Sequence, residues 1–338
     1  MRTTAFVSAA VTLGAVLTGP CVGGVYGQSQ SLTAQRAEPI VAFLGAMTLV
    51  SPPAQAASQG RNLTIKGSDT MVILGQRWAE VYMSKNPGST IQVTGGGSGT
   101  GIAALINGTC DIAESSRPMK DTEKEQTRQK RGKEVVEFPV ALDGLAVYVN
   151  ERNPISELSV EQLKRIYTGA AKKWSDVGGR DERIILYGRE NNSGTYVYFK
   201  EHVLENADYF PTTQTLPGTA AVINAVARDA RGIGYGGIAY GKGIKHLRVK
   251  KDANSPAIAP SMENVISGVY PISRFLFWYL AGQPSGDLKK LLDWVMSKDG
   301  QSVVENVGYY PLPESVLSKY SGAASKDKKS KGSKGGAK

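Results

Sequence analysis

The chain has 338 residues, enough for two lobes with separate cores, and its 41% hydrophobic content is typical of a globular α/β protein. The net charge of +10 at first suggests a nucleic-acid partner, but much of it lies in the lysine-rich segment 326–338, expected to be a solvated, disordered extension. Two histidines and two cysteines exclude a histidine-rich metal centre and a disulfide framework, so no metal is expected. No nucleic-acid partner is expected either, because a soluble tail accounts for the basic segment.

The first 57 residues have the pattern of an export signal. Two apolar runs, 5–17 and 39–50, are both shorter than a comfortable membrane span. The Ala-Gln-Ala sequence at 54–56 fits the small-x-small rule for cleavage, so we expect the mature protein to begin near Ala57. The expected location is therefore periplasmic or otherwise outside the cytoplasmic membrane.

Short strands, small polar turns and helices alternate through the chain from residue 62 onward. Strands are expected at 62–66 and 91–93, and each runs directly into a Gly/Ser/Thr turn and then a helix with an apolar face. A third strand begins near 111 and leads to another polar turn at 114–118. This alternation predicts parallel α/β layering, in which ligands bind at the carboxyl ends of the strands.

The run 135–149 is apolar almost throughout and is expected to form a buried strand. Asp143 lies in its middle, an unusual place for a carboxylate, which makes Asp143 a candidate site residue; the alternative is a turn aspartate before Gly144. Further helices are expected after a capping box at 159–162 and over 220–229. The glycine-rich segment 232–237 resembles a dinucleotide fingerprint but follows a helix instead of a strand, so no cofactor is expected.

The segment 189–195, Arg-Glu-Asn-Asn-Ser-Gly-Thr, is the strongest local signal, because a strand-like run precedes it and a helical pattern follows it. Ser193 falls at the helix N-cap, with Gly194 and Thr195 in the first turn. A helix start offers free N–H groups and the positive end of the macrodipole to an oxyanion. Arg189 adds a planar fork of donors suited to a tetrahedral oxyanion.

The alternative for this segment is an ordinary capped helix behind a polar turn. A second Ser/Thr/Gly turn at 97–101, together with the arginine four residues before Ser193, favours the anion site.

These motifs, in this order and spacing, resemble the phosphate-binding proteins of bacterial phosphate ABC transporters. The resemblance covers about 65–313 and is carried by the segments 67–71, 97–101, 111–117, 189–195 and 270–274. It implies an α/β periplasmic-binding-protein fold (type II-like) with two lobes, each a mixed sheet flanked by helices, and a two-strand hinge. The implied boundaries are 62–142 plus 249–320 for lobe 1, 143–248 for lobe 2, and 321–338 for the disordered tail.

The resemblance also implies which residues hold the ligand when hinge closure shuts it between the lobes. The expected phosphate-binding residues are Thr70, Met71, Ser98, Ser116, Arg117, Asp143, Arg189, Ser193, Gly194 and Thr195. Arg117 and Asp143 are included because this chain departs from the family pattern, as described next.

Two positions depart from the family pattern. Ser116 stands where the best-known members carry the aspartate that accepts the proton of hydrogen phosphate, and Asn191 stands where they carry the acidic partner of the arginine. Asp143 is the candidate replacement for the proton acceptor, with Asp69 as its nearest rival, and Arg117 is expected to add positive charge.

The leading functional hypothesis is an exported, monomeric, non-enzymatic receptor that captures inorganic phosphate and delivers it to a membrane permease. The alternative is a secreted phosphatase-like hydrolase on the same scaffold, which the scarcity of histidines disfavours. A third hypothesis is a surface binding protein whose working part is the basic tail.

Overall fold

The computed structural model describes residues 62–321, all of which belong to one compact unit of the chain, Gln55–Lys338. The predicted export region and, apart from Ser321, the predicted tail lie outside the described residues, so both stay predictions. Within the described part of the chain, no helix is long and apolar enough to cross a membrane.

Most of the strands belong to one mixed sheet. The strands are β1 (Asn62–Gly67), β2 (Thr90–Thr94), β3 (Ile112–Ser115), β4 (Val135–Val149), β5 (Glu157–Ser159), β6 (Ile185–Arg189), β7 (Gln214–Leu216), β8 (Gly232–Gly237), β9 (Lys245–His246), β10 (Arg248–Lys250), β11 (Ala257–Ile258) and β12 (Ser273–Ala281). The main sheet has the order β2-β1-β3-β12-β4-β8-β6-β7, with β9 beside β4, and a small sheet has the order β11-β10-β5. The predicted parallel pairing is confirmed for β1 with β2 and β3, whereas β12 and β4 run antiparallel to each other.

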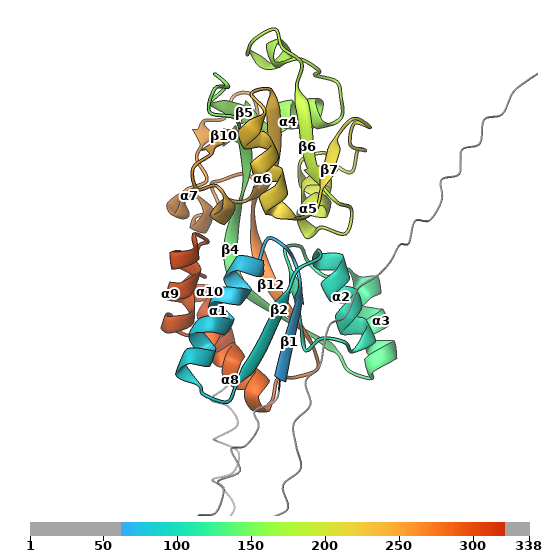
Figure 1. Cartoon of the computed structure of the whole chain (residues 1–338), viewed down its shortest axis with the longest axis vertical. Coiled ribbons are helices and arrows are strands. Elements are labelled where there is room, and N and C mark those ends of the chain that lie inside the picture. The colour runs from blue at the N-terminus through green and yellow to red at the C-terminus, as the bar shows by residue number, and fades with distance from the viewer. Residues whose placement is uncertain (1–61, 322–338) are drawn as a thin grey trace, which may run out of the picture. The chain divides into compact units, whose positions relative to one another are not determined.

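Helices flank the sheet. They are α1 (Val72–Lys85), α2 (Ser98–Asn107), α3 (Asp121–Arg131), α4 (Val160–Tyr167), α5 (Gly194–His202), α6 (Gly218–Arg228), α7 (Met262–Ile266), α8 (Gly286–Val295), α9 (Lys298–Val307) and α10 (Glu314–Ser321), with short 3₁₀ turns η1 (Trp174–Val177) and η2 (Ile238–Tyr240). The predicted two-lobed α/β fold is confirmed: Figure 1 shows β4 and β12 running between a lobe that holds α1, β1 and α8 and a lobe that holds α4, α6 and β6.

Local sequence signals explain several helix starts. The predicted capping box is confirmed, because the Ser159 hydroxyl accepts from Gln162 N at 3.0 Å and the Gln162 side chain accepts from Ser159 N at 2.9 Å. Gly97, just before α2, has a φ of 91°, which favours glycine. A Cβ there would lie 2.8 Å from the carbonyl oxygen of Asn192, so the glycine also permits a close approach of two turns.

Two hydrophobic clusters form the cores of the lobes. In the first, which joins β1, α1, β12 and α9, the rings of Trp78 and Trp278 meet edge to face at 5.3 Å. In the second, which joins α4, α5, β6 and β8, Phe199 stacks on Tyr235 at 4.0 Å. Val249, also in this second cluster, shows that β10 packs with α4 and β6.

The turn predicted at 114–118 begins later than expected. Glu114 and Ser115 belong to β3 and are fully buried, because β3 pairs with β12 through Phe277 opposite Ser115 and Trp278 opposite Glu114. The Trp278 indole donates to Glu114 Oε1 at 3.1 Å, whereas Oε2 has no hydrogen-bond partner among the described residues. Burial raises the pKa of Glu114 to about 8, and the indole hydrogen bond offsets only part of this rise.

We expect Glu114 to make the stability of the protein fall as the pH rises. Because folding raises the pKa of this carboxyl from 4.5 to about 8, the folded protein binds the proton more tightly than the unfolded chain. Its contribution is complete below the unfolded pKa, and the free energy of unfolding declines as the pH rises through the folded pKa.

The variant Glu114→Gln stays neutral at every pH, so it should lose less stability than the wild type between about pH 5 and pH 9, by at least about 1 kcal/mol. Urea denaturation of both proteins at several pH values across that window measures the difference. Parallel stability curves for the two proteins would show that Glu114 does not titrate in this way.

Candidate functional site

Buried hydroxyl groups gather where β1, β3 and β6 end and α2 and α5 begin. Each of these side chains belongs to a residue that is at most 2% exposed: Ser68, Thr70, Ser98, Ser116, Ser193 and Thr195. The Ser68 hydroxyl donates to Ser116 Oγ at 2.9 Å, and Ser98 Oγ accepts from Ser116 N at 3.1 Å. The structure therefore joins three turns that lie far apart in the sequence into one polar cluster.

The two threonines of the predicted set meet directly. Thr70 Oγ1 and Thr195 Oγ1 lie 2.8 Å apart, although 125 positions separate them in the chain. The N–H of Met71, predicted to bind the ligand, donates to the carbonyl oxygen of Ser68 at 2.8 Å in this structure. Met71 thus lies at the cluster, but its N–H has an internal acceptor.

Ser193 is the N-cap of α5, as predicted. Its Oγ accepts from Thr195 N at 3.2 Å. The N–H of Gly194, the first residue of α5, is at a position for which helix geometry provides no acceptor. A Cβ on Gly194 would lie 2.3 Å from Ser98 Oγ and 2.7 Å from Ser116 Oγ. Only glycine fits here, and its backbone faces the hydroxyl cluster.

Arg189 ends β6 and is 1% exposed. Its Nη2 donates to Asp69 Oδ2 at 2.9 Å, its Nε donates to Glu190 Oε2 at 3.1 Å, and its Nη1 donates to Thr219 Oγ1 at 2.8 Å. Burial raises the pKa of Glu190, but the hydrogen bonds and charge of Arg189 outweigh it and hold that pKa below its usual value. Glu190 and Asp69 therefore supply the acidic partners that the sequence lacks at Asn191.

Asp143 lies in the middle of β4 and is fully buried, so the prediction of a strand position is confirmed and the alternative of a turn aspartate is wrong. Its Oδ2 accepts from Arg274 Nη2 at 2.8 Å and from Arg274 Nε at 3.0 Å, and its Oδ1 accepts from Ile238 N at 3.0 Å. Arg274 also donates through Nη2 to Thr195 Oγ1 at 3.0 Å. Asp143 therefore reaches the hydroxyl cluster as half of a buried ion pair.

Arg274 was not among the predicted ligand residues, although it ends the segment 270–274 that carries the family resemblance. Its position follows from strand register, since Arg274 pairs directly with Asp143 across β12 and β4. A charged residue at the start of an aromatic strand is the only local signal in the sequence that points to it.

The structure does not bring the Arg117 guanidinium to the hydroxyl cluster through any hydrogen bond of the described residues. Arg117 Nη2 pairs with Glu123 Oε1 at 2.7 Å, and Nη1 donates to Glu123 Oε2 at 2.9 Å. The group thus faces the start of α3, and its predicted contribution to the site stays a prediction.

Direct hydrogen bonds connect the turn before α2 with the turn before α5. Gly99 N donates to the Asn192 carbonyl oxygen at 2.9 Å, and Asn192 Nδ2 donates to the Gly96 carbonyl oxygen at 2.9 Å and to Thr100 Oγ1 at 3.1 Å. Asn192 lies inside the predicted motif, but no residue pattern indicates this contact, because it depends on how the two lobes meet.

Neither histidine belongs to the cluster, because His202 Nδ1 lies 3.0 Å from the Tyr198 carbonyl oxygen and His246 lies on β9. The described residues contain no group of three or more His, Cys, Asp or Glu that could hold a metal ion. The arrangement offers many neutral donors and two guanidinium groups whose charge is balanced by carboxylates. Such a set suits the binding of a small oxyanion out of water.

A family model described as the PBP superfamily domain matches residues 52–299 of this chain. The phosphate-binding protein PstS of Pseudomonas aeruginosa is 36% identical over 282 residues, which cover 78% of this chain and 87% of that protein. PstS of Bacillus subtilis is 33% identical over 255 residues, which cover 75% and 81%. Among solved structures, an ABC-type phosphate transport receptor from Vibrio cholerae has a TM-score of 0.61 at 28% identity, covering 74% of this chain and 100% of that one.

Breaking the Asp143–Arg274 pair should destabilise the fold strongly. In Arg274→Met the carboxylate of Asp143 stays buried without its cation, which costs about 3–5 kcal/mol. The double variant Asp143→Leu/Arg274→Met removes both charges and should regain most of that loss. Urea denaturation of the two variants provides the comparison; a double variant no more stable than the single one would show that packing, not charge, dominates.

Proposed function

The chain belongs to the PstS family of phosphate-binding proteins within the PBP superfamily, and on that basis we propose that it captures inorganic phosphate between its two lobes and delivers it to the permease of an ABC transporter. It acts as a receptor and not as an enzyme. The observation that carries the proposal is the cluster of buried hydroxyl groups around the first turn of α5, with Arg189 and Arg274 beside it.

The ligand set that we propose contains the predicted residues together with one addition. The members are Thr70, Met71, Ser98, Ser116, Arg117, Asp143, Arg189, Ser193, Gly194, Thr195 and the added Arg274. Arg274 is included because its Nη2 lies 3.0 Å from Thr195 Oγ1, which in turn lies 2.8 Å from Thr70 Oγ1. Phosphate would replace the hydroxyl-to-hydroxyl bonds, such as the one between Thr70 and Thr195, with stronger bonds to a charged acceptor.

We also propose an extracytoplasmic, monomeric protein whose mature form begins near Ala57. Lobe 1 comprises 62–142 and the segment from β12 onward to residue 320, and lobe 2 comprises the chain between them. This division follows the predicted boundary at 142/143. It moves residues 249–272 from lobe 1 to lobe 2, because Val249 and Ile272 pack in the cluster of α4 and β6.

Arg189→Ala should reduce phosphate affinity at least about tenfold, because a charge-assisted hydrogen bond contributes about 1.5–3 kcal/mol. The variant also leaves Asp69 and Glu190 as uncompensated carboxylates near the anion. Isothermal titration with phosphate measures the loss, and thermal melting verifies the fold.

Two further variants sharpen this experiment. Arg189→Lys keeps the charge but loses the planar fork, so it should fold and still bind weakly. Arg248→Ala removes an exposed arginine paired with Glu157 and should leave phosphate affinity within about twofold. Wild-type affinity in a folded Arg189 variant would show that the anion site lies elsewhere.

The proton of hydrogen phosphate needs an acceptor, whereas sulfate at neutral pH carries no proton to donate. A carboxylate oxygen has two acceptor positions, and Asp143 Oδ1 accepts only from Ile238 N among the described residues. Asp69 Oδ1 likewise accepts from one donor, Gly96 N at 2.8 Å, and Oδ2 accepts from Arg189. We propose Asp143 as the acceptor that selects phosphate because it is fully buried and its partner Arg274 donates to Thr195, whereas the Asp69 carboxylate is partly exposed.

Asp143→Asn should therefore weaken phosphate binding and narrow the difference in affinity between phosphate and sulfate. Sites built around one specific hydrogen bond reject analogues that lack it by about 10⁴–10⁵, so the change should span orders of magnitude. Titrations of Asp143→Asn and the matched variant Asp69→Asn with both anions measure it. If only Asp69→Asn loses selectivity, Asp69 is the acceptor.

A further inference from the structure

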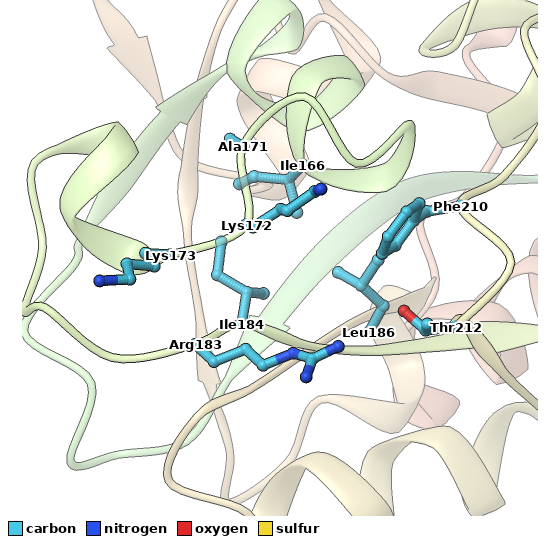
Figure 2. Close-up of a pocket in the computed structure, with 9 residues that line it drawn as sticks. All are labelled: Ile166, Ala171, Lys172, Lys173, Arg183, Ile184, Leu186, Phe210 and Thr212. Carbon is cyan, nitrogen blue, oxygen red and sulfur yellow. The ribbon is translucent and has the colours of Figure 1, made fainter.

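A cavity on lobe 2 lies apart from the hydroxyl cluster. It has a volume of about 360 Å³, and its walls come from the end of α4, the segment before η1, the start of β6 and the segment before β7 (Figure 2). This volume is at the lower end of the range of about 300–1,000 Å³ that small-molecule sites occupy. The floor is apolar, because Ile166, Ile184 and Leu186 are buried members of the lobe-2 core.

The rim of the cavity is positively charged. Lys172, Lys173 and Arg183 line it, whereas none of its nine lining residues is acidic. Lys173 is neutralised by Asp181 at 2.9 Å, and Figure 2 shows its side chain pointing away from Phe210. Within the described residues, neither the Lys172 ammonium nor the Arg183 guanidinium has an ion-pair partner.

The two unpaired cations flank the one aromatic wall. Lys172 Nζ lies 5.6 Å from the centre of the Phe210 ring, a contact that holds the ammonium over the cavity. In Figure 2 the Arg183 side chain extends on the opposite side, toward Thr212. A ligand here would meet an apolar floor, an aromatic face and two cations that need a counter-charge.

We propose that this cavity binds a small organic carboxylate with an aromatic or branched aliphatic body. The body would rest on Ile184, Leu186 and Phe210, and the carboxylate would pair with Lys172 and Arg183. A protein partner fits less well, because a stable interface needs a much wider apolar centre. The only large hydrophobic side chains exposed in the described part of the chain are Ile266 and Val269, neither of which lines the cavity.

The test uses 3-phenylpropionate as the probe and follows the amide NMR shifts of the full chain during a titration. Saturable shifts are expected in segments 166–173 and 183–186, and they should persist when phosphate is added. The neutral analogue 3-phenylpropan-1-ol has the same body without the charge, so it should bind about fivefold more weakly.

Two variants with exposed substitutions complete the test without disturbing the core. Lys172→Gln/Arg183→Gln should weaken the acid about fivefold and leave the alcohol unchanged, whereas Lys173→Gln should change neither by more than about twofold. The proposal is overturned by shifts that do not saturate in these segments, by equal affinity for acid and alcohol, or by undiminished binding to the double variant. Displacement of the probe by phosphate would also overturn it, since the probe would then occupy the anion site.

Discussion

The buried ion pair between Asp143 and Arg274 is the interaction on which the rest of the site depends. The two residues face each other on β4 and β12, the strands that connect the lobes, so the ion pair forms when these two strands pair in the observed register. A buried pair is tolerated only when its remaining donors and acceptors are satisfied. Here Arg274 Nη1 donates to the Ser116 carbonyl oxygen and Nη2 donates to Thr195, which places one guanidinium against turns from both lobes.

Arg189 links the charge balance at the hydroxyl cluster to the closure of the two lobes. Arg189 belongs to lobe 2, while Asp69 follows β1 in lobe 1, so opening the lobes would separate this cation from one of its two carboxylates. The Asn192 contacts to Gly96 and Thr100 would break in the same movement. The electrostatic potential at the hydroxyl cluster therefore depends on the angle between the lobes, and an anion that binds between them changes the same balance.

Features that depend on neighbouring residues could be predicted from the sequence. The full extent of β4 and the Ser193 cap follow from an uninterrupted apolar run and from a polar turn before a helix. Asp69, the second acidic partner of Arg189, and Arg274, the cationic partner of Asp143, could not be predicted, because each lies at least 120 positions away and depends on lobe contact or strand register. Glu114 was misplaced in a turn because a carboxylate argues locally against a buried strand.

The charge balance also explains why a serine suits position 116. Asp69, Glu190 and Asp143 already oppose the two guanidinium groups of Arg189 and Arg274, so the immediate surroundings carry more carboxylates than cations. Another carboxylate at 116 would lie against Ser98 and the backbone of Gly194, where an anion is expected to approach. A hydroxyl group there adds no charge and can donate or accept. Ser116 thus adds no negative charge where we propose that the anion binds, and the discrimination among anions is the role we propose for Asp143 on the connecting strand β4.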